Sequence, residues 1–523
     1  MELVSLQQWA IWNGKYTLLP YVRTMKIETD SLLPLFWDAF WEDASPYACI
    51  LESGKGGRYS VIGLKPVSVI TGKGNHGKVL EPDDNGTGFT EARQLQGAPI
   101  EQVREWMRAW SGPKPEALPD CIGGAVGLWS YDMARSLEKL PESAQDDLLF
   151  PDFLFQRYEQ LWIVDHSECS LYLTVHVPVP GGKIDSLQED CLSQLYMDAQ
   201  QTAMEMEKQW ERWSSAGLAS YQRQQRMRSV IEQDRLEKDM EQWPGLITSM
   251  SKSEFEQSVR RVQQYIVQGD VFQVNLSLRQ SLAAQVSAET LYDWLRLINP
   301  SPYMGMLRTP DFSIVSASPE LLVKLDNGKL STRPIAGTRR RGQTPMEDRA
   351  MEDELLTNEK ERAEHIMLVD LERNDIGRVA AYGSVHVPEL MTVERYSHVM
   401  HLVSQVEGLL APDKDAFDVL AAVFPGGTIT GAPKIRTMEI IEELEPVRRG
   451  PYTGSIGWFD YSGNMEFNII IRSILVRGGI CHIQAGAGIV IDSDPEREFY
   501  ECLNKAKALW KAVQHGETQG EPT

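Results

Sequence analysis

The stretch SKSEFEQSVRRVQQYIVQGDVFQVNLSLRQSL (Ser251–Leu282) sets a helical pattern directly against a strand pattern. In its first half, apolar residues recur at the spacing of a helix face, namely Phe255, Val259, Val262 and Ile266. Ser251 or Ser253 precedes them and can cap the first turn. The second half, DVFQVNLSLRQSL, alternates apolar and polar residues, as half-buried strands do. A helix followed by a strand is therefore expected here.

Outward from this stretch, helical and strand patterns remain mixed. Further helices are expected at about 347–373, 432–445 and 494–513, with strands between them. Before about residue 200, short apolar runs such as ACILES, GGRYSVIGL and GGAVGLWSY alternate with turn residues. The chain has no repeat of roughly 20–50 residues and no regular βαβ spacing. These patterns favour an α+β fold over a doubly wound parallel sheet.

The segment 201–245 differs from its surroundings in composition. QQTAMEMEKQWERW and RQQRMRSVIEQDRLEKDMEQW are polar and charged without a sustained apolar stripe. We therefore expect an N-terminal region over 1–200, an exposed, charged helical linker over 201–245, a catalytic region over 246–515 and a tail over 516–523.

Composition narrows the class of protein. The formal net charge of -22 argues against a nucleic-acid-binding surface, because phosphates are neutralised by Lys and Arg. The six cysteines lack CxxC or metal-ligand spacing, which suits reduced thiols in the cytoplasm. The N-terminus resembles no signal peptide, and no apolar run is long enough to predict a membrane span.

Local cations nevertheless indicate an anion site. RPIAGTRRRG (Arg333–Gly342) concentrates four arginines in ten residues. FNIIIRSI places Arg472 in a strongly apolar strand, where a lone arginine needs an anionic partner such as a bound carboxylate.

Two predicted helices carry carboxylates on one side. In NEKERAEHIMLVDLERNDIGR, Glu361 and Glu364 form either a solvated face or a Mg²⁺ site, and Gly377 is expected to end the helix in the left-handed conformation. In SDPEREFYECLNKAKALWKAV, Asp494 is a plausible cap. Glu501 and Lys505 there form either an i,i+4 pair, worth roughly 0.2–0.5 kcal/mol, or a metal ligand and a carboxylate partner.

Glycine-rich and histidine-containing stretches leave further alternatives open. FPGGTITGAPK lacks the Lys-Ser/Thr of a phosphate loop, so it is either an anion-holding turn or a tight loop before a helix. Gly486 and Gly488 imply close backbone approach to another strand or to a ligand. His398 and His401 lie in an apolar strand, where a structural histidine is commoner than a catalyst.

Together these stretches resemble the chorismate-utilising enzymes, which include the large subunits of anthranilate synthase and aminodeoxychorismate synthase. The resemblance covers nearly the whole chain. The matching motifs include FQVNLS, NPSPYM, SPE, PIAGTRRRG, AEHIMLVDLERND, SHVMHL, FPGGTITGAPK, YTGSIGW, FNIIIR, AGAGIV and ECLNKAKA, in that order. It implies an anthranilate synthase component I-like fold, with two large antiparallel β-sheets packed as a sandwich and helices outside.

The resemblance also implies a Mg²⁺-dependent reaction in which ammonia replaces a chorismate hydroxyl. Glu364 and Glu501 would be the Mg²⁺ ligands, Glu320 the acid that protonates the departing hydroxyl, and His401 a neighbour of the ring carboxylate. The implied substrate-binding residues are Gln273, Gly337, Thr338, Thr428, Tyr452, Arg472, Gly486, Ala487, Gly488 and Lys505.

Three positions bear on the nucleophile and the branch of the family. Members that add water carry lysine where this chain has Gln273, which favours ammonia. Many aminodeoxychorismate synthases have a lysine that acts covalently at the position of Ala336. Alanine at this position resembles the anthranilate synthases, whereas Asn275 resembles the aminobenzoate branch. Aminodeoxychorismate synthase component I, on the path to para-aminobenzoate and folate, is the leading prediction. Anthranilate synthase component I is the alternative.

The remaining expectations concern partners and effectors. No glutamine-hydrolysing triad is apparent, so a glutamine amidotransferase small subunit is expected to supply ammonia. Ser53, Pro302, Tyr303 and Met304 match the family's tryptophan pocket, which is a feedback site, a structural site, a relic or simply sheet core. A non-catalytic regulatory subunit is disfavoured by the intact acidic residues and His401, and a water-using synthase by Gln273.

Overall fold

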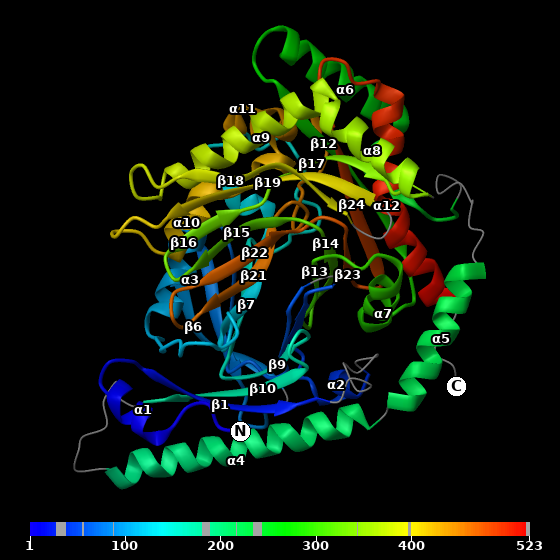
Figure 1. Ribbon diagram of the computed structural model, residues 1–523. Helices are drawn as coiled ribbons and strands as arrows, with labels where there is room; N and C mark the ends of the chain where they lie inside the picture. The colour runs from blue at the N-terminus through cyan, green and yellow to red at the C-terminus, as the bar shows by residue number, and fades with distance from the viewer. Residues whose placement is uncertain are drawn as a thin grey trace.

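The computed structural model describes residues 1–27, 38–54, 57–86, 88–179, 189–215, 217–233, 243–342, 344–395 and 399–518. Within these residues two 12-stranded antiparallel sheets face one another, and helices cover their outer sides (Figure 1). The predicted α+β fold is confirmed.

The first sheet follows the order β1, β10, β9, β3, β2, β13, β14, β23, β24, β12 and β11, with β20 paired to β12. The strands are β1 (Leu18–Lys26), β10 (Ser170–Pro178), β9 (Gln160–Asp165), β3 (Tyr59–Gly63), β2 (Ala48–Glu52), β13 (Tyr303–Arg308), β14 (Ser313–Ser318), β23 (Ser473–Arg477), β24 (Ile480–Ile489), β12 (Gln273–Ala283), β11 (Ile247–Thr248) and β20 (Gly431–Ala432).

The second sheet follows the order β17, β19, β16, β15, β22, β21, β7, β8, β4, β5 and β6, with β18 paired to β19. The strands are β17 (Ile335–Arg340), β19 (Val399–Leu409), β16 (Lys329–Thr332), β15 (Leu321–Asp326), β22 (Met465–Ile469), β21 (Ser455–Asp460), β7 (Gly124–Trp129), β8 (Phe153–Tyr158), β4 (Ser68–Lys73), β5 (His76–Pro82), β6 (Phe89–Gln96) and β18 (His386–Arg395).

Both sheets combine strands from the two ends of the chain. In the first sheet β2 pairs with β13, and in the second β7 pairs with β21. Between the sheets, Leu307 and Ile314 of the first sheet join the same apolar cluster as Val126 and Ile456 of the second. The regions expected before residue 200 and after residue 246 therefore share their sheets and their core.

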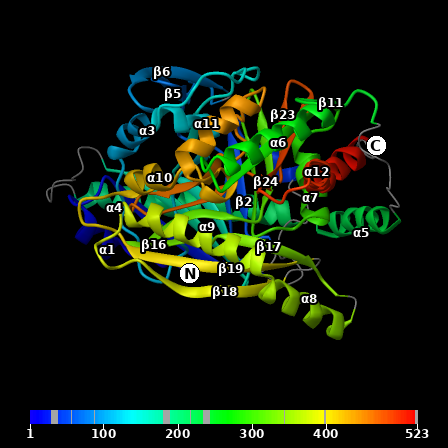
Figure 2. The same ribbon diagram turned by 90° about the horizontal axis from the view of Figure 1, so that it is seen from above.

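The helices are α1 (Leu6–Trp12), α2 (Asp38–Asp43), α3 (Pro99–Arg108), α4 (Glu189–Ser214), α5 (Gly217–Gln233), α6 (Lys252–Val267), α7 (Ala288–Ile298), α8 (Pro345–Thr357), α9 (Glu359–Gly377), α10 (Ala416–Val423), α11 (Lys434–Leu444) and α12 (Pro495–Thr518), with 3₁₀ turns η2 (Tyr131–Ser136) and η6 (Gly427–Ile429). From above, α8 and α9 lie along β17, β18 and β19, and α12 lies beside α6 and α7 (Figure 2). Among the described residues, none of these helices has both the length and the apolar character that crossing a bilayer requires.

Helix termini agree with the sequence in part. Ser251 caps α6 and forms a capping box with Glu254, as the pattern predicted. The single helix expected over 347–373 is two, because the Asn358 side chain accepts a hydrogen bond from the Glu361 N–H and starts α9 anew. The left-handed ending predicted at Gly377 is wrong. Gly377 is the last residue of α9 and is not among the positive-φ glycines, and Arg378 follows with φ of -69°.

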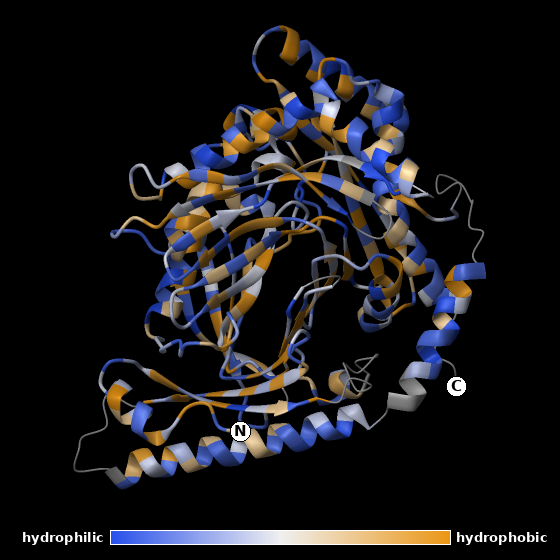
Figure 3. Cartoon of the chain, in the orientation of Figure 1, coloured by the Kyte–Doolittle hydropathy of each residue, from blue (hydrophilic) through white to orange (hydrophobic). Residues whose placement is uncertain are grey.

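The segment expected to be an exposed linker contains a helix that packs on the first sheet. α4 buries an apolar stripe, Ala199, Ala203, Met206, Trp210 and Trp213. The Trp162 indole of β9 donates to the Met206 carbonyl at 3.1 Å, and α4 contacts β1 and β10. Figure 3 shows hydrophilic and hydrophobic residues alternating along α4 beneath these strands. For α4, the expectation of exposure is wrong.

Candidate active site

A cavity of about 760 Å³ lies where β12 and β24 of one sheet meet β17 of the other, beneath α9 and α12. Segments far apart in sequence converge there, because each supplies side chains or glycines to one wall. The predicted site residues that line it are Gln273, Glu320, Gly337, Glu364, Thr428, Tyr452, Arg472, Gly486, Gly488, Glu501 and Lys505.

Three predicted residues lie just outside this lining. Thr338 and His401 are backbone partners between β17 and β19, and the Thr338 side chain lies outside the described part. Burial and the Arg472 charge lower the pKa of His401, although a hydrogen bond with the Gly337 backbone partly opposes this shift. The imidazole is therefore neutral near pH 7. Ala487 is fully buried in the core, so only its backbone could serve a ligand. His398 lies outside the described residues.

Arg472 supplies a half-buried cation to the cavity. The prediction that Arg472 lies within a strand is wrong. The residue lies between β22 and β23, and its φ is 52°. Burial lowers the pKa of its guanidinium, while Tyr452 and Glu501 oppose that shift. It forms no ion pair with any carboxylate in the described part of the chain. A partly desolvated cation without a salt-bridge partner favours a bound anion.

The cavity face of α12 carries the expected i,i+4 pair. Asp494 caps the helix by accepting a hydrogen bond from the Arg497 N–H at 2.9 Å, as predicted. Lys505 Nζ lies 2.8 Å from Glu501 Oε1 and donates to the Gly486 carbonyl at 3.0 Å. The ammonium is thus held against the glycine-containing strand β24, where it can also meet a ligand carboxylate.

On α9, glycines opposite the helix let its carboxylates approach the sheets. Gln273 Nε2 donates to Glu364 Oε1 at 2.7 Å, and a Cβ on Gly488 would lie 2.4 Å from that same Nε2. A Cβ on Gly337, whose φ is 59°, would lie 2.7 Å from Glu361 Oε2. The positive φ of Gly337 favours glycine there, whereas Gly488 leaves the room that the Gln273 amide occupies.

Glu320 has the environment of a general acid. Its side chain is 6% exposed. Burial raises its pKa to about 7, although the Thr428 hydroxyl, the Lys505 charge and the Ile335 backbone oppose the rise. A carboxyl with this pKa can hold a proton near neutrality and release it to a leaving group.

A family model of chorismate binding enzymes matches residues 47–511. The chain belongs to this family. Aminodeoxychorismate synthase component 1 of Bacillus subtilis (strain 168) is 45% identical over 470 residues, covering 90% of this chain and 92% of that protein. Anthranilate synthase component 1 of Acetivibrio thermocellus is 40% identical over 517 residues, covering 98% of each.

The solved structure of anthranilate synthase component I from Streptococcus pneumoniae TIGR4 superimposes with a TM-score of 0.67 at 33% identity. The match covers 87% of this chain and 92% of that one. The sandwich of two antiparallel sheets is therefore shared with this relative, which confirms the fold that the sequence resemblance implied.

This chorismate-binding enzyme offers carboxylate oxygens suited to Mg²⁺. Glu361 and Glu364 from α9 and Glu498 and Glu501 from α12 all line the cavity. Glu361 Oε2 is buried without a hydrogen-bond partner among the described residues. The described residues contain no preformed group of three or more His, Cys, Asp or Glu for a metal. The donor set fits an ion bound by one or two carboxylates plus substrate oxygens.

The arginines of the stretch 333–342 are largely engaged by the enzyme's own carboxylates. Arg333 pairs with Glu389 and Glu394, and Arg341 Nη2 lies 2.6 Å from Asp348 Oδ2. Arg339 does line the cavity, but it pairs with Glu354 and Glu361. These three arginines therefore face carboxylates of the chain itself.

Sequence reasoning missed Arg449. This fully buried guanidinium donates to both carboxylate oxygens of Glu445 and to the carbonyls of Ile429 and Asn275, at 3.0 and 2.8 Å. It thereby joins β12, η6 and the turn before Tyr452. The signal in the sequence is the i,i+4 spacing of Glu445 and Arg449 in EPVRR, a spacing that exposed and buried ion pairs share.

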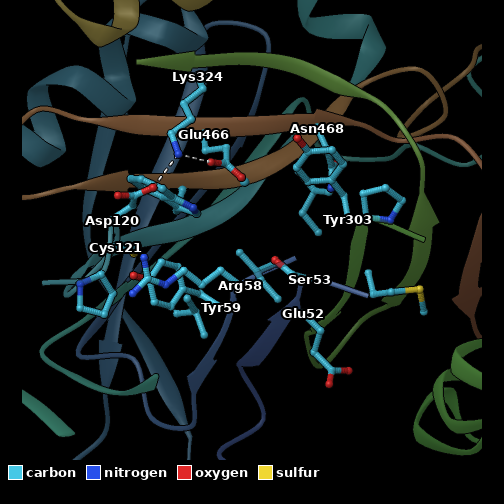
Figure 4. Close-up of a pocket in the computed structure, with 18 residues that line it drawn as sticks. Glu52, Ser53, Arg58, Tyr59, Asp120, Cys121, Tyr303, Lys324, Glu466 and Asn468 are labelled. Atoms are coloured by element: carbon cyan, nitrogen blue, oxygen red, sulfur yellow. Dashed lines mark hydrogen bonds and ion pairs between the residues drawn. The ribbon is translucent and has the colours of Figure 1, made fainter. Parts of the chain in front are cut away.

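The four residues of the predicted tryptophan pocket line a second cavity of about 370 Å³ (Figure 4). The figure shows Lys324 between Asp120 and Glu466. Lys324 Nζ lies 3.1 Å from Glu466 Oε2. The structure therefore places Ser53, Pro302, Tyr303 and Met304 around one cavity, and a tryptophan ligand there remains a prediction.

Proposed function

We propose that this enzyme aminates chorismate with ammonia, as the large component of an aminodeoxychorismate synthase. The observation that carries the proposal is the meeting of Arg472, Lys505 and Glu320 in one cavity. Two cations suit a dicarboxylate substrate, and a buried acid suits a hydroxyl that leaves poorly as hydroxide.

The proposed reaction balances without an oxidant or reductant. The ammonia lone pair forms the new C–N bond while the C–O bond of the ring hydroxyl breaks. Glu320 gives its proton to the departing oxygen, which leaves as water. The new ammonium group releases one proton to solvent, and the Glu320 carboxylate takes one up. With no lysine at Ala336, ammonia attacks the ring directly.

Glu364 and Glu501 are the residues proposed to hold Mg²⁺, which when bound would offset the charge of a substrate carboxylate. Arg472 and Lys505 would orient the substrate. The neutral His401 imidazole would lie near the ring carboxylate. Ammonia is proposed to come from a separate glutamine amidotransferase subunit, in keeping with the component numbering of the relatives.

The branch is tested by the identity of the product. The chain is incubated with chorismate, MgCl₂ and ammonium chloride, and products are resolved with and without an aminodeoxychorismate lyase. The proposal predicts para-aminobenzoate only when the lyase is present. It also predicts that glutamine cannot replace ammonium when the chain is alone.

Ala336 specifically favours a second candidate, anthranilate synthase component I, in which ammonia enters at C2. Anthranilate and pyruvate formed without added lyase would establish that alternative and exclude the aminobenzoate branch. The 45% identity to the Bacillus subtilis aminodeoxychorismate synthase component and Asn275 support the leading proposal.

A further inference from the structure

Three amide side chains beside the active cavity have unpaired oxygens. Gln273 Oε1, Asn275 Oδ1 and Gln484 Oε1 are buried and lack a hydrogen-bond partner among the described residues. All three residues line the 760 Å³ cavity. A buried acceptor without a donor is unfavourable, so three in one place indicate a missing donor.

The hydrogen-bond network fixes which amide atoms are free. Gln273 Nε2 already donates to Glu364, which leaves Oε1 unpaired. Ser277 Oγ donates to Glu445 Oε1 at 2.8 Å, so it can only accept from Gln484 Nε2, at 2.9 Å. The unpaired atom of Gln484 is therefore the acceptor oxygen and not the donor nitrogen.

Gln273 and Asn275 belong to β12, and Gln484 belongs to the neighbouring strand β24. Asn275 lies opposite Gly488, Ser277 opposite Gly486, and Arg279 opposite Gln484. Gln273 and Asn275 share one face of β12 because alternate residues point the same way. A Cβ on Gly486 would lie 2.5 Å from Asn275 Oδ1, so the Asn275 amide extends over that glycine toward Gln484.

A second, small cavity of about 30 Å³ lies behind Gln484. It shares Gln484 and Tyr452 with the active cavity and is otherwise lined by residues including Arg279 and Arg449. Its volume suits one molecule the size of water or ammonia. Arg279 Nη1 there is a buried donor without a partner in the described part of the chain. An unpaired donor and an unpaired acceptor thus line one small space.

We propose that this small cavity and the Gln484, Asn275 and Gln273 amides form a binding site for neutral ammonia, leading to the reacting ring carbon. Ammonia has one lone pair for Arg279 Nη1 and three N–H groups for amide oxygens. The arginines of the small cavity already pair with Asp147 and Glu445, and none of its lining residues is a carboxylate that could hold ammonium. At Gln273 the oxygens hold the N–H groups and leave the lone pair free for attack. The inference rests on the proposed ammonia-dependent function.

The test compares Gln484→Met with wild type in ammonium-dependent turnover of chorismate. Losing one acceptor should raise the KM for ammonium roughly three- to tenfold. The Kd for chorismate, followed by tryptophan fluorescence, should change less than twofold. The matched control is Gln102→Met, because Gln102 also has a buried unpaired Oε1 and donates from Nε2 to the Gly97 carbonyl, far from the cavity.

If neutral ammonia is the bound species, the KM for total ammonium should also fall as pH rises. An unchanged ammonium KM in Gln484→Met, with a changed chorismate Kd or melting temperature only, would mean that the space holds structural water, and it would overturn the inference. Failure of the proposed function is separately visible, because wild type would then turn over chorismate without ammonium.

Discussion

At the scale of single residues, Glu320 joins catalysis to stability. Its pKa of about 7 in the folded enzyme lies above the ordinary value of 4.5. As pH rises from 4.5 to 7, the unfolded chain loses the Glu320 proton while the folded enzyme still holds it, so the free energy of unfolding falls over this range. The folded state therefore loses stability relative to a neutral side chain, by on the order of 3 kcal/mol above pH 7.

Glu320→Gln should abolish amination while keeping chorismate binding. Its melting temperature should exceed that of wild type at pH 8, and the difference should shrink toward pH 4.5. Turnover by wild type should fall as pH rises above 7, since the acid must hold its proton. Turnover assays and thermal unfolding across this range check both statements. A variant that melts below wild type at pH 8 would contradict the buried, neutral carboxyl.

Arg472 tests the anion site directly. Arg472→Gln should weaken chorismate binding by on the order of tenfold or more, because a charge-assisted hydrogen bond is lost. Arg497→Gln removes the same charge from an exposed position of α12 and should leave the Kd unchanged. An equal loss of chorismate affinity in both variants would indicate a general effect of charge rather than a specific contact.

The sequence could predict much of this site because its residue types occur in motifs that resemble a known family. It could not predict Arg449, whose partners are backbone carbonyls of Ile429 and Asn275 that only the folded chain brings near. Nor could it show that Arg472 lies between two strands with a positive φ, because the flanking residues are uniformly apolar.

At the scale of elements, α4 shows where composition misleads. Its buried stripe is interspersed with charged residues, so the mean composition resembles a solvated linker although Trp210 and Trp213 are 3% and 2% exposed. Spacing carries the signal here, and composition does not.

Trp213→Ala should lower the free energy of unfolding by about 3–5 kcal/mol, because it opens a cavity between α4 and the first sheet. Met197→Ala, on the same helix but 50% exposed, should change it by about 0.5 kcal/mol or less. Chemical denaturation of both variants provides the measurement. Similar values for the two would show that α4 is not packed as described.

At the scale of the whole molecule, the two ends of the chain build one unit. Because β2 pairs with β13 and β7 pairs with β21, neither end completes a sheet alone. Which strands pair over such separations could not be read from local patterns, which indicate strands but not their neighbours. The resemblance to a family supplied that architecture instead.

A fragment comprising residues 246–518 should therefore not fold. It keeps β14 and β22 beside β13 and β21, but it lacks β2 and β7 on their other sides and the strands that close the core between the sheets. Circular dichroism and thermal unfolding should show no cooperative transition in the fragment. A cooperative transition would contradict the shared core.

The proposed function and the proposed ammonia site both require ammonia to be the nucleophile in the cavity that holds Glu320 and Arg472. The most direct measurement is mass spectrometry of the product formed from chorismate, MgCl₂ and ¹⁵N-labelled ammonium chloride. If ammonia is the nucleophile, the product carries one labelled nitrogen in place of one hydroxyl. An unlabelled hydroxylated isomer formed at the same rate without ammonium would contradict it.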